Sequence, residues 1–174
     1  MGQHPRDREG RLLPDAGFPI GKEAPGRLER LRRFVNSANL ESGADRLADV
    51  ADAMDFLQAE GWQPWSVDAH GLERLRRTRD LLRALAVANL DGRRDAAPWR
   101  ALVGVTAALG VAVREGSPIL VGDGDVAGEL VAIAVAASLD GSWPRLKACR
   151  NESCRWVVYD RTRSGSNEWC SMSA

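Results

Sequence analysis

All three cysteines of this 174-residue chain fall within its last 26 residues, and the 148 residues before them contain none. Cys149 and Cys154 have four residues between them, and Cys170 follows sixteen positions after Cys154. A loop as short as 150–153 can fold back on itself and direct two sulfurs at one centre. Thiolates are ligands that zinc favours in tetrahedral sites, so the clustering predicts a zinc-binding module here.

The residues between the second and third cysteines favour a strand followed by a turn. The run 156–159, Trp-Val-Val-Tyr, combines aromatic and β-branched side chains, which is typical of strands. The polar stretch 161–167 has Gly165 near its centre, as turns do. Trp169 and Cys170 then bring the chain back towards the first two cysteines.

A closed zinc site takes four ligands, and the cysteines supply three. The only histidines, His4 and His70, lie far upstream, and His70 is expected to be a surface or capping residue near a helix start. Two other interpretations remain open. The cysteines could be unrelated buried thiols, or Cys149 and Cys154 could form a disulfide, although the sequence has no secretory feature.

The pattern Cys-x4-Cys, aromatic strand, turn and Trp-Cys-Ser-Met at 169–172 resembles the CGNR-type zinc finger of bacterial transcription regulators. In that family the motif continues with Cys-Gly-Asn-Arg, whose cysteine completes the metal site and is followed by a basic tail. This chain stops at Ala174, where that cysteine would come next. We therefore expect a chain clipped just before the motif, with Cys149, Cys154 and Cys170 as the ligands present.

A second stretch, 34–40 (FVNSANL), resembles the opening of the ABATE domain, the N-terminal partner of CGNR fingers. Members of that family begin with a Leu-Val-Asn-Thr stretch, and Ser37 here keeps the hydroxyl of the threonine. The resemblance implies a stress-induced bacterial regulator whose helical body receives a signal, such as a small molecule, while the finger contacts DNA. Taken alone, Asn36 between apolar residues predicts a cap or a buried hydrogen-bonding group.

The formal net charge is zero but is unevenly distributed, with −3 over residues 1–144 and +3 over residues 145–174. A basic module beside an acidic body is compatible with phosphate contact. The candidate nucleic-acid contacts are Arg155, Arg161 and Arg163, which flank the predicted strand and turn. The excess is modest, and a solvated surface explains it equally well.

The sequence predicts a cytoplasmic protein with no membrane span. No apolar run reaches the ~18 residues that a spanning helix needs. The N-terminal stretch MGQHPRDREGR lacks the apolar core of a signal peptide.

Hydrophobic periodicity predicts a mostly α fold of about five helices in residues 27–144, after a flexible or loosely docked lead-in over 1–26 that contains four prolines. The expected helices start at Arg27, at Asp45 (ending at Gly61), at Asp68 (ending at Asp91), around Trp99 to Leu109, and at Asp125. The last of these, 126–139, is nearly all apolar and is expected to be central to the core.

One β-hairpin is expected, from the runs 110–114 and 118–121 joined by Glu115, Gly116 and Ser117. Residues 145–174 complete the predicted architecture as a treble-clef-like or ribbon-like zinc module. No flexible linker precedes this module, so it should pack on the helical body.

Two further groups of residues favour structural roles. The aromatic loop containing Trp62, Pro64 and Trp65 is expected to plug an edge of the core. Five arginines between Arg74 and Arg83 could form a nucleic-acid face, but ion pairing with Glu73 and Asp80 on a solvated surface explains them better.

No nucleophile, base and acid can be assembled into a recognisable motif, so an enzyme is not expected. Besides the regulator, two other functions remain open. One is a protein-interaction module with purely structural zinc, and the other is a thiol redox switch using Cys149 and Cys154.

Overall fold

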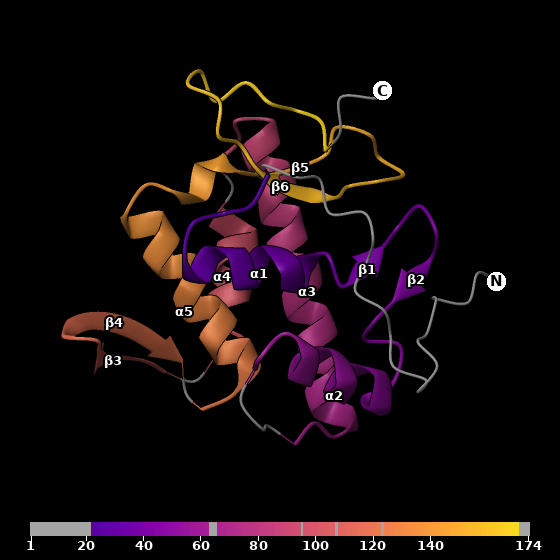
Figure 1. Ribbon diagram of the computed structural model, residues 1–174, viewed down its shortest axis with the longest axis vertical. Coiled ribbons are helices and arrows are strands. Elements are labelled where there is room, and N and C mark those ends of the chain that lie inside the picture. Colours follow the sequence, from indigo (N-terminus) through magenta and orange to yellow (C-terminus); the bar gives the residue numbers. More distant parts are fainter. Residues whose placement is uncertain (1–21, 63–65, 95, 107, 123, 171–174) are drawn as a thin grey trace.

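The computed structural model describes residues 22–62, 66–94, 96–106, 108–122 and 124–170 (Figure 1). The helices are α1 (Arg27–Val35), α2 (Val50–Ala59), α3 (Ala69–Leu90), α4 (Ala96–Val103) and α5 (Val126–Leu139), with a 3₁₀ turn η1 (Trp143–Arg145). The strands form three antiparallel pairs, β1 (Ala38–Asn39) with β2 (Ala44–Asp45), β3 (Leu109–Arg114) with β4 (Ser117–Gly122), and β5 (Leu146–Ala148) with β6 (Val157–Tyr159). The expected mostly α fold is confirmed.

Helix α5 lies at the centre of the core, as its sequence predicts. It packs against α1, α3, β4 and η1, so it is surrounded on most sides and apolar almost all round. Leu130, Val131 and Ala134 are completely buried. Asp125 caps the helix by accepting a hydrogen bond from the Gly128 N–H at 2.7 Å.

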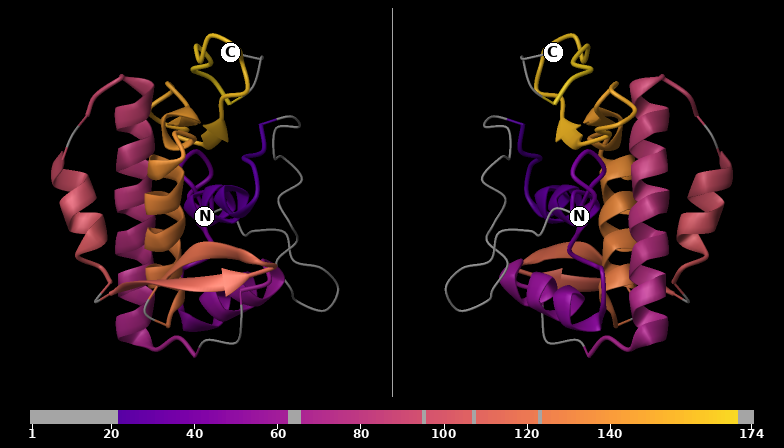
Figure 2. Two further views of the ribbon diagram at one scale, coloured as in Figure 1. Left: turned by 90° about the vertical axis from the view of Figure 1, so that its left-hand side faces the viewer. Right: turned by 90° about the vertical axis from the view of Figure 1, so that its right-hand side faces the viewer.

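Helix α3, with 22 residues, is a long helix of the body. Figure 2 shows it alongside α5, with α4 on its outer side. Asp68 caps α3 through a 2.7 Å bond from the Gly71 N–H, and the helix ends at Asp91 as expected. The predicted helix around 99–109 is shorter than expected. Helix α4 ends at Val103, because Leu109 begins β3 and pairs with Gly122.

The predicted hairpin is confirmed as β3–β4. Glu115 and Gly116 both adopt positive φ, 51° and 76°, which is the combination found in type I′ two-residue hairpin turns. Strand β4 lies on α5, and at its end Gly122 meets the backbone of Gly128 so closely that a Cβ on Gly122 would lie 2.0 Å from the Gly128 carbonyl carbon. The hairpin therefore docks through a contact that only glycine allows.

The second helix begins later than predicted, and Asp45 is not its cap. Asp49 caps α2 by accepting from the Asp52 N–H at 2.8 Å. Asp45 instead lies in β2, where its carboxylate accepts two bonds from Arg79 at 2.5 and 3.0 Å. The reason is tertiary: Arg79 lies 34 residues away and is too far along the chain for a local pattern to reveal it.

The interpretation of the α3 arginines as a solvated surface is wrong for Arg79 and Arg83, which are buried. Arg83 donates to the carbonyl of Val35, the last residue of α1, at 2.6 Å and to that of Ala38 in β1 at 3.0 Å. Burial lowers the pKa of the Arg83 guanidinium. Arg74 pairs with Asp125, so α3 is tied to α5 by charge as well as packing.

Trp62 plugs the core as expected. It is buried, its ring meets Phe34 edge-on at 6.5 Å, and the Arg30 guanidinium lies 4.0 Å above it. Pro64 and Trp65, the other two residues of that loop, lie outside the described residues. His70 is exposed in the first turn of α3.

Over the described ranges, no helix combines the length and apolar character needed to cross a membrane.

Candidate metal centre

The C-terminal segment folds as a short β-ribbon with one loop between its two strands and a second loop after them. In β5–β6, Leu146 pairs with Tyr159 and Ala148 with Val157. The ladder continues one step further, because the Cys149 N–H donates to the Trp156 carbonyl at 2.8 Å. Cys149 thus emerges from the end of the ribbon with its backbone fixed.

The loop between the first two cysteines is a tight knuckle built around Asn151. The Asn151 carbonyl accepts from the N–H groups of Cys154 and Arg155 at 3.1 and 2.9 Å, and its side chain accepts from the Ser153 N–H at 3.0 Å. Arg155 closes the turn with a φ of 46°. This folding-back places Cys154 opposite Cys149, as the four-residue spacing predicts.

A second loop returns Cys170 to the knuckle. The Arg150 N–H donates to the Glu168 carbonyl at 2.8 Å, and their side chains form an ion pair at 2.6 Å. These contacts tie the chain just before Cys170 to the residue just after Cys149. Trp169 and Cys170 therefore approach the first two cysteines, as expected.

Asp160 organises the loop that leads from β6 to Cys170, and its carboxylate is completely buried. One oxygen accepts from the N–H and hydroxyl of Thr162 at 2.9 and 2.6 Å, and the other from the Asn167 N–H at 2.9 Å and Lys147 Nζ at 3.1 Å. Burial alone opposes ionisation, but these donors outweigh it and lower the pKa of Asp160 to about 2.

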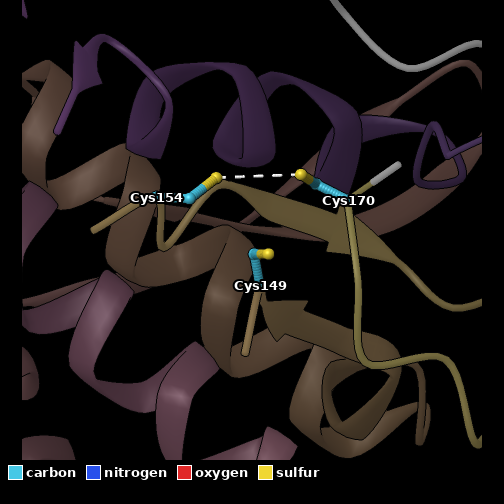
Figure 3. A group of neighbouring side chains, drawn as sticks. All are labelled: Cys149, Cys154 and Cys170. Atoms are coloured by element: carbon cyan, nitrogen blue, oxygen red, sulfur yellow. Dashed lines mark hydrogen bonds between the residues drawn. The ribbon is translucent and has the colours of Figure 1, made fainter. Parts of the chain in front are cut away.

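The three sulfur atoms come together, all within 4.8 Å of one another (Figure 3). Cys154 Sγ and Cys170 Sγ are 3.7 Å apart, and none of the three cysteines forms a disulfide. A tetrahedron with Zn–S bonds of about 2.3 Å has sulfur–sulfur edges of about 3.8 Å. The cluster therefore fits one face of a tetrahedral thiolate site.

Burial opposes ionisation of the first two thiols, whereas their hydrogen bonds lower the pKa of Cys149 and have mixed effects on that of Cys154. Burial is the largest influence on both, and it raises the pKa of Cys154 to about 12. At Cys149 the backbone donors of Cys170 and Asn151 outweigh burial, so the pKa of this thiol is lowered. Backbone N–H groups directed at a sulfur stabilise its thiolate, which is the form that binds metal.

The ribbon is attached to the helical body by Asn36. Its side chain donates to the Val157 carbonyl and accepts from the Val157 N–H, both at 2.8 Å, and all of these groups are buried. Buried Arg32 adds a 3.3 Å bond to the same carbonyl. The sequence predicted either a cap or a buried hydrogen-bonding group at Asn36. Asn36 is the C-cap residue of α1 and is also buried, and only the fold identifies β6 as the partner of its side chain.

The chain before α1 also contacts this module. The backbone carbonyl of Lys22 accepts a hydrogen bond from the Tyr159 N–H at 3.0 Å. The Lys22 ammonium group donates to the side-chain oxygen of Asn167 at 2.6 Å. Residues 22–26, the described part of the expected flexible lead-in, are therefore joined to the cysteine-rich module. Residues 1–21 lie outside the described residues.

The candidate nucleic-acid contacts differ in their surroundings. Arg155 is part of the knuckle, where it pairs with Glu152 at 3.1 Å and keeps 20% of its side chain exposed. Arg161 is exposed and donates to the Glu23 carbonyl at 2.9 Å. Arg163 is exposed, and within the part of the chain that the structure describes it makes no hydrogen bond or ion pair.

The structure also bears on the disulfide that the sequence left open as an alternative. Cys149 and Cys154 do not form one. The sulfur pair in hydrogen-bonding contact is Cys154 with Cys170, which sequence spacing alone does not favour.

Two family models match the chain. Residues 30–141 match the ABATE family, described as "Putative stress-induced transcription regulator". Residues 145–174 match the CGNR zinc finger, and this match includes all three cysteines. Both resemblances noted in the sequence are thereby confirmed. A search of curated proteins returned no match to this chain.

Proposed function

This chain belongs to the ABATE family of stress-induced transcription regulators and carries a CGNR zinc finger, and from that premise we propose that it is a zinc-dependent, DNA-binding regulator. The helical body would receive a signal, and the finger would contact DNA. The role is regulatory and requires no catalysis. The observation that carries the proposal is the sulfur cluster at one end of the β5–β6 ribbon, with the arginine-bearing loop 161–163 following the other end. The ribbon between them is tied to the body through Asn36.

Zinc would be held by the thiolates of Cys149, Cys154 and Cys170, and when bound it would cross-link the knuckle, the ribbon and the return loop. The ribbon and the Asp160 network already position these segments, so binding requires little rearrangement. The donor set is entirely soft sulfur, which favours zinc over calcium or magnesium.

The DNA contact is proposed for the loop 161–163. All three acidic residues of the finger are engaged with cations, namely Glu152 with Arg155, Asp160 with Lys147, and Glu168 with Arg150. Arg161 and Arg163 have no carboxylate partner in the described ranges, so they supply unneutralised positive charge. Such arginines bind phosphate without regard to sequence and make affinity depend on salt.

The test is binding of the zinc-loaded protein to mixed-sequence duplex DNA at two salt concentrations. Binding should weaken steeply with salt, and replacing both Arg161 and Arg163 by alanine should flatten the logarithmic salt slope by up to about two units. Arg77→Ala is the matched control, because Arg77 is also exposed but lies on α3. It should leave the slope unchanged.

The alternative function is a protein-interaction module with structural zinc. If the folded, zinc-loaded protein binds neither mixed nor genomic DNA at low salt, the regulator proposal loses its mechanism and this alternative replaces it. A redox switch is less favoured, because Cys149 is 2% exposed and is shielded from oxidants.

A further inference from the structure

The β3–β4 hairpin has one edge that the protein covers and one that it leaves open. Figure 1 shows the hairpin at one side of the helical body, where β4 lies on α5. Its two-residue turn makes Arg114 and Ser117 the first hydrogen-bonded pair of the ladder. Hydrogen-bonded and non-hydrogen-bonded pairs alternate in an antiparallel ladder, so the backbone groups of Leu109, Val111 and Val113 point away from β4.

The outer edge of β4 is covered. Pro118, which lies opposite Val113, has no N–H to offer to another strand. The Leu120 carbonyl accepts a hydrogen bond from Arg27 Nη1 at 2.9 Å, so it faces away from β3 and is already satisfied. These two positions protect β4 against the addition of a further strand.

The outer edge of β3 has no such protection. Among the described residues, no donor or acceptor pairs with the outward backbone groups of Val111 or Val113. The stretch 109–113, Leu-Gly-Val-Ala-Val, contains no charge, no proline and no bulge. Natural proteins use charges, prolines and bulges to protect exposed strand edges, and an edge without them is a template for another strand.

The exposed side chains of β3 lie on the face of the hairpin that is turned towards α5. A Cβ on Gly122 would point into α5, and Leu120 shares that face because side chains alternate along a strand. Val111 lies opposite Leu120 in the ladder, so Val111 and Val113 are on the same face. Helix α5 packs on β4 rather than on β3, and the two valines remain 70% and 73% exposed. Strand β3 therefore presents an apolar strip beside an open edge.

We propose that β3 pairs with β3 of a second copy of this chain, so that two hairpins form one four-stranded antiparallel sheet, β4–β3–β3–β4, in a homodimer. With the twofold axis at Val111, the outward backbone groups of Val111 meet those of Val111 of the second copy, and Leu109 meets Val113 of the second copy. This twofold register matches all three outward-facing residues at once. It also places both α5 helices on one face of the sheet, with the exposed valines between them, which gives two packed layers.

The charges of β3 are compatible with a second copy as the partner. No charged side chain lies within 109–113, so the twofold axis opposes no like charges there. Arg114 lies opposite Ala108 of the second copy in this register. The two Arg114 residues are then about 20 Å apart along the sheet, which exceeds the ~10 Å screening length at 0.1 M salt.

The size of the contact predicts a weak dimer. A pairing of about five residues per copy buries less than the ~800 Å² per partner of a standard stable interface. We therefore expect a Kd on the order of 10 µM. The dimer does not require DNA, so its test is independent of the proposed function.

Sedimentation equilibrium of the whole protein, from about tenfold below to about tenfold above this Kd, measures the association. The parent should change from monomer to dimer over that range. Val111→Lys should weaken dimerisation at least about tenfold, because it places two cations opposite one another at the axis. Val111→Glu should do the same with two carboxylates.

The decisive measurement mixes these two variants. Because Val111 lies opposite itself, an equal mixture of Val111→Lys and Val111→Glu pairs an ammonium group with a carboxylate. Association should then return to within about threefold of the parent. If the mixture associates as weakly as either variant alone, the pairing at Val111 is overturned.

Leu40→Lys is the matched control, since Leu40 is also an exposed apolar residue, at 45%, but lies in the turn after β1. It should leave the Kd unchanged. All three variants should keep thermal midpoints within a few degrees of the parent at concentrations where the parent is monomeric, because the substituted side chains are exposed. The proposal is overturned if the parent stays monomeric over the whole range, or if Leu40→Lys weakens the dimer as much as Val111→Lys does.

Discussion

The side-chain amide of Asn36 pairs with both backbone groups of Val157, as a neighbouring strand would. The two bonds are each 2.8 Å long and join residues 121 positions apart. Val157 lies in β6, between the knuckle and the Asp160 loop, so this pairing sets the position of the whole finger on α1. It also gives a structural reason for an asparagine in the stretch that resembles the opening of the ABATE domain.

Asn36→Ala should lower the free energy of unfolding by about 2–3 kcal/mol, because it leaves the buried Val157 N–H without an acceptor. Denaturant unfolding measures the loss, and hydrogen exchange should show lost protection at 157–159. Asn39→Ala is the control, since Asn39 accepts bonds only within an exposed turn. Equal effects of the two variants would mean that the Asn36–Val157 pairing does not hold the finger.

The zinc site should be weak with three sulfur ligands and strong with four, because each Zn–S bond contributes to closing the site. The chain as printed should bind substoichiometric zinc, and addition of Cys-Gly-Asn-Arg after Ala174 should raise the content to about one per chain. Elemental analysis after dialysis against a chelator measures the zinc content of both forms. Addition of Ser-Gly-Asn-Arg is the control and should not raise the zinc content. Full, chelator-resistant occupancy without the added cysteine would show that the fourth ligand comes from elsewhere.

Asp160 should make stability depend on acid pH. Its pKa in the folded chain, about 2, lies below the ordinary value of 3.8, so ionisation favours the folded state. The contribution, about 2.5 kcal/mol, is present above pH 4 and is lost as the pH falls towards 2.

Asp160→Asn should therefore be less stable at neutral pH by about 3 kcal/mol, since it also leaves Lys147 buried without its carboxylate. The difference in free energy of unfolding between this variant and the parent should become smaller as the pH falls from 4 to 2. Unfolding curves at several pH values test this, with exposed Asp140→Asn as the control. A difference that stays constant over that range would contradict the assigned role.

Gly122→Ala should displace the hairpin from α5. The new Cβ would collide with the Gly128 backbone, and relief requires strand or helix to move, at a cost of about 3 kcal/mol. Gly110→Ala is a matched control in the partner strand, because its Cβ would meet only Val121 Cγ2 at 3.5 Å. Thermal unfolding of both variants is the test. Equal unfolding midpoints for Gly122→Ala and Gly110→Ala would show that the close contact is not required.

Much of the fold and of the candidate site was predictable, since the features that specify them are local. Asp68 and Asp125 each bond an N–H three residues ahead, so helix starts are visible in a few residues. The apolar run 126–139 identified the core helix, and the spacing of Cys149 and Cys154 identified the knuckle. The one helix start that failed, at Asp45, failed because a distant partner took its carboxylate.

By itself, then, the sequence determined the presence and order of the five helices, the starts of α3 and α5, the hairpin and the three sulfurs that share one centre, because each depends on propensity, capping or spacing within a short stretch. Only the tertiary structure decided which charged groups are buried and with whom, as in Arg83 beneath α1 and Lys147 with Asp160. A buried charge or amide must be paired, and which partner pairs with it depends on segments that meet only when the chain packs.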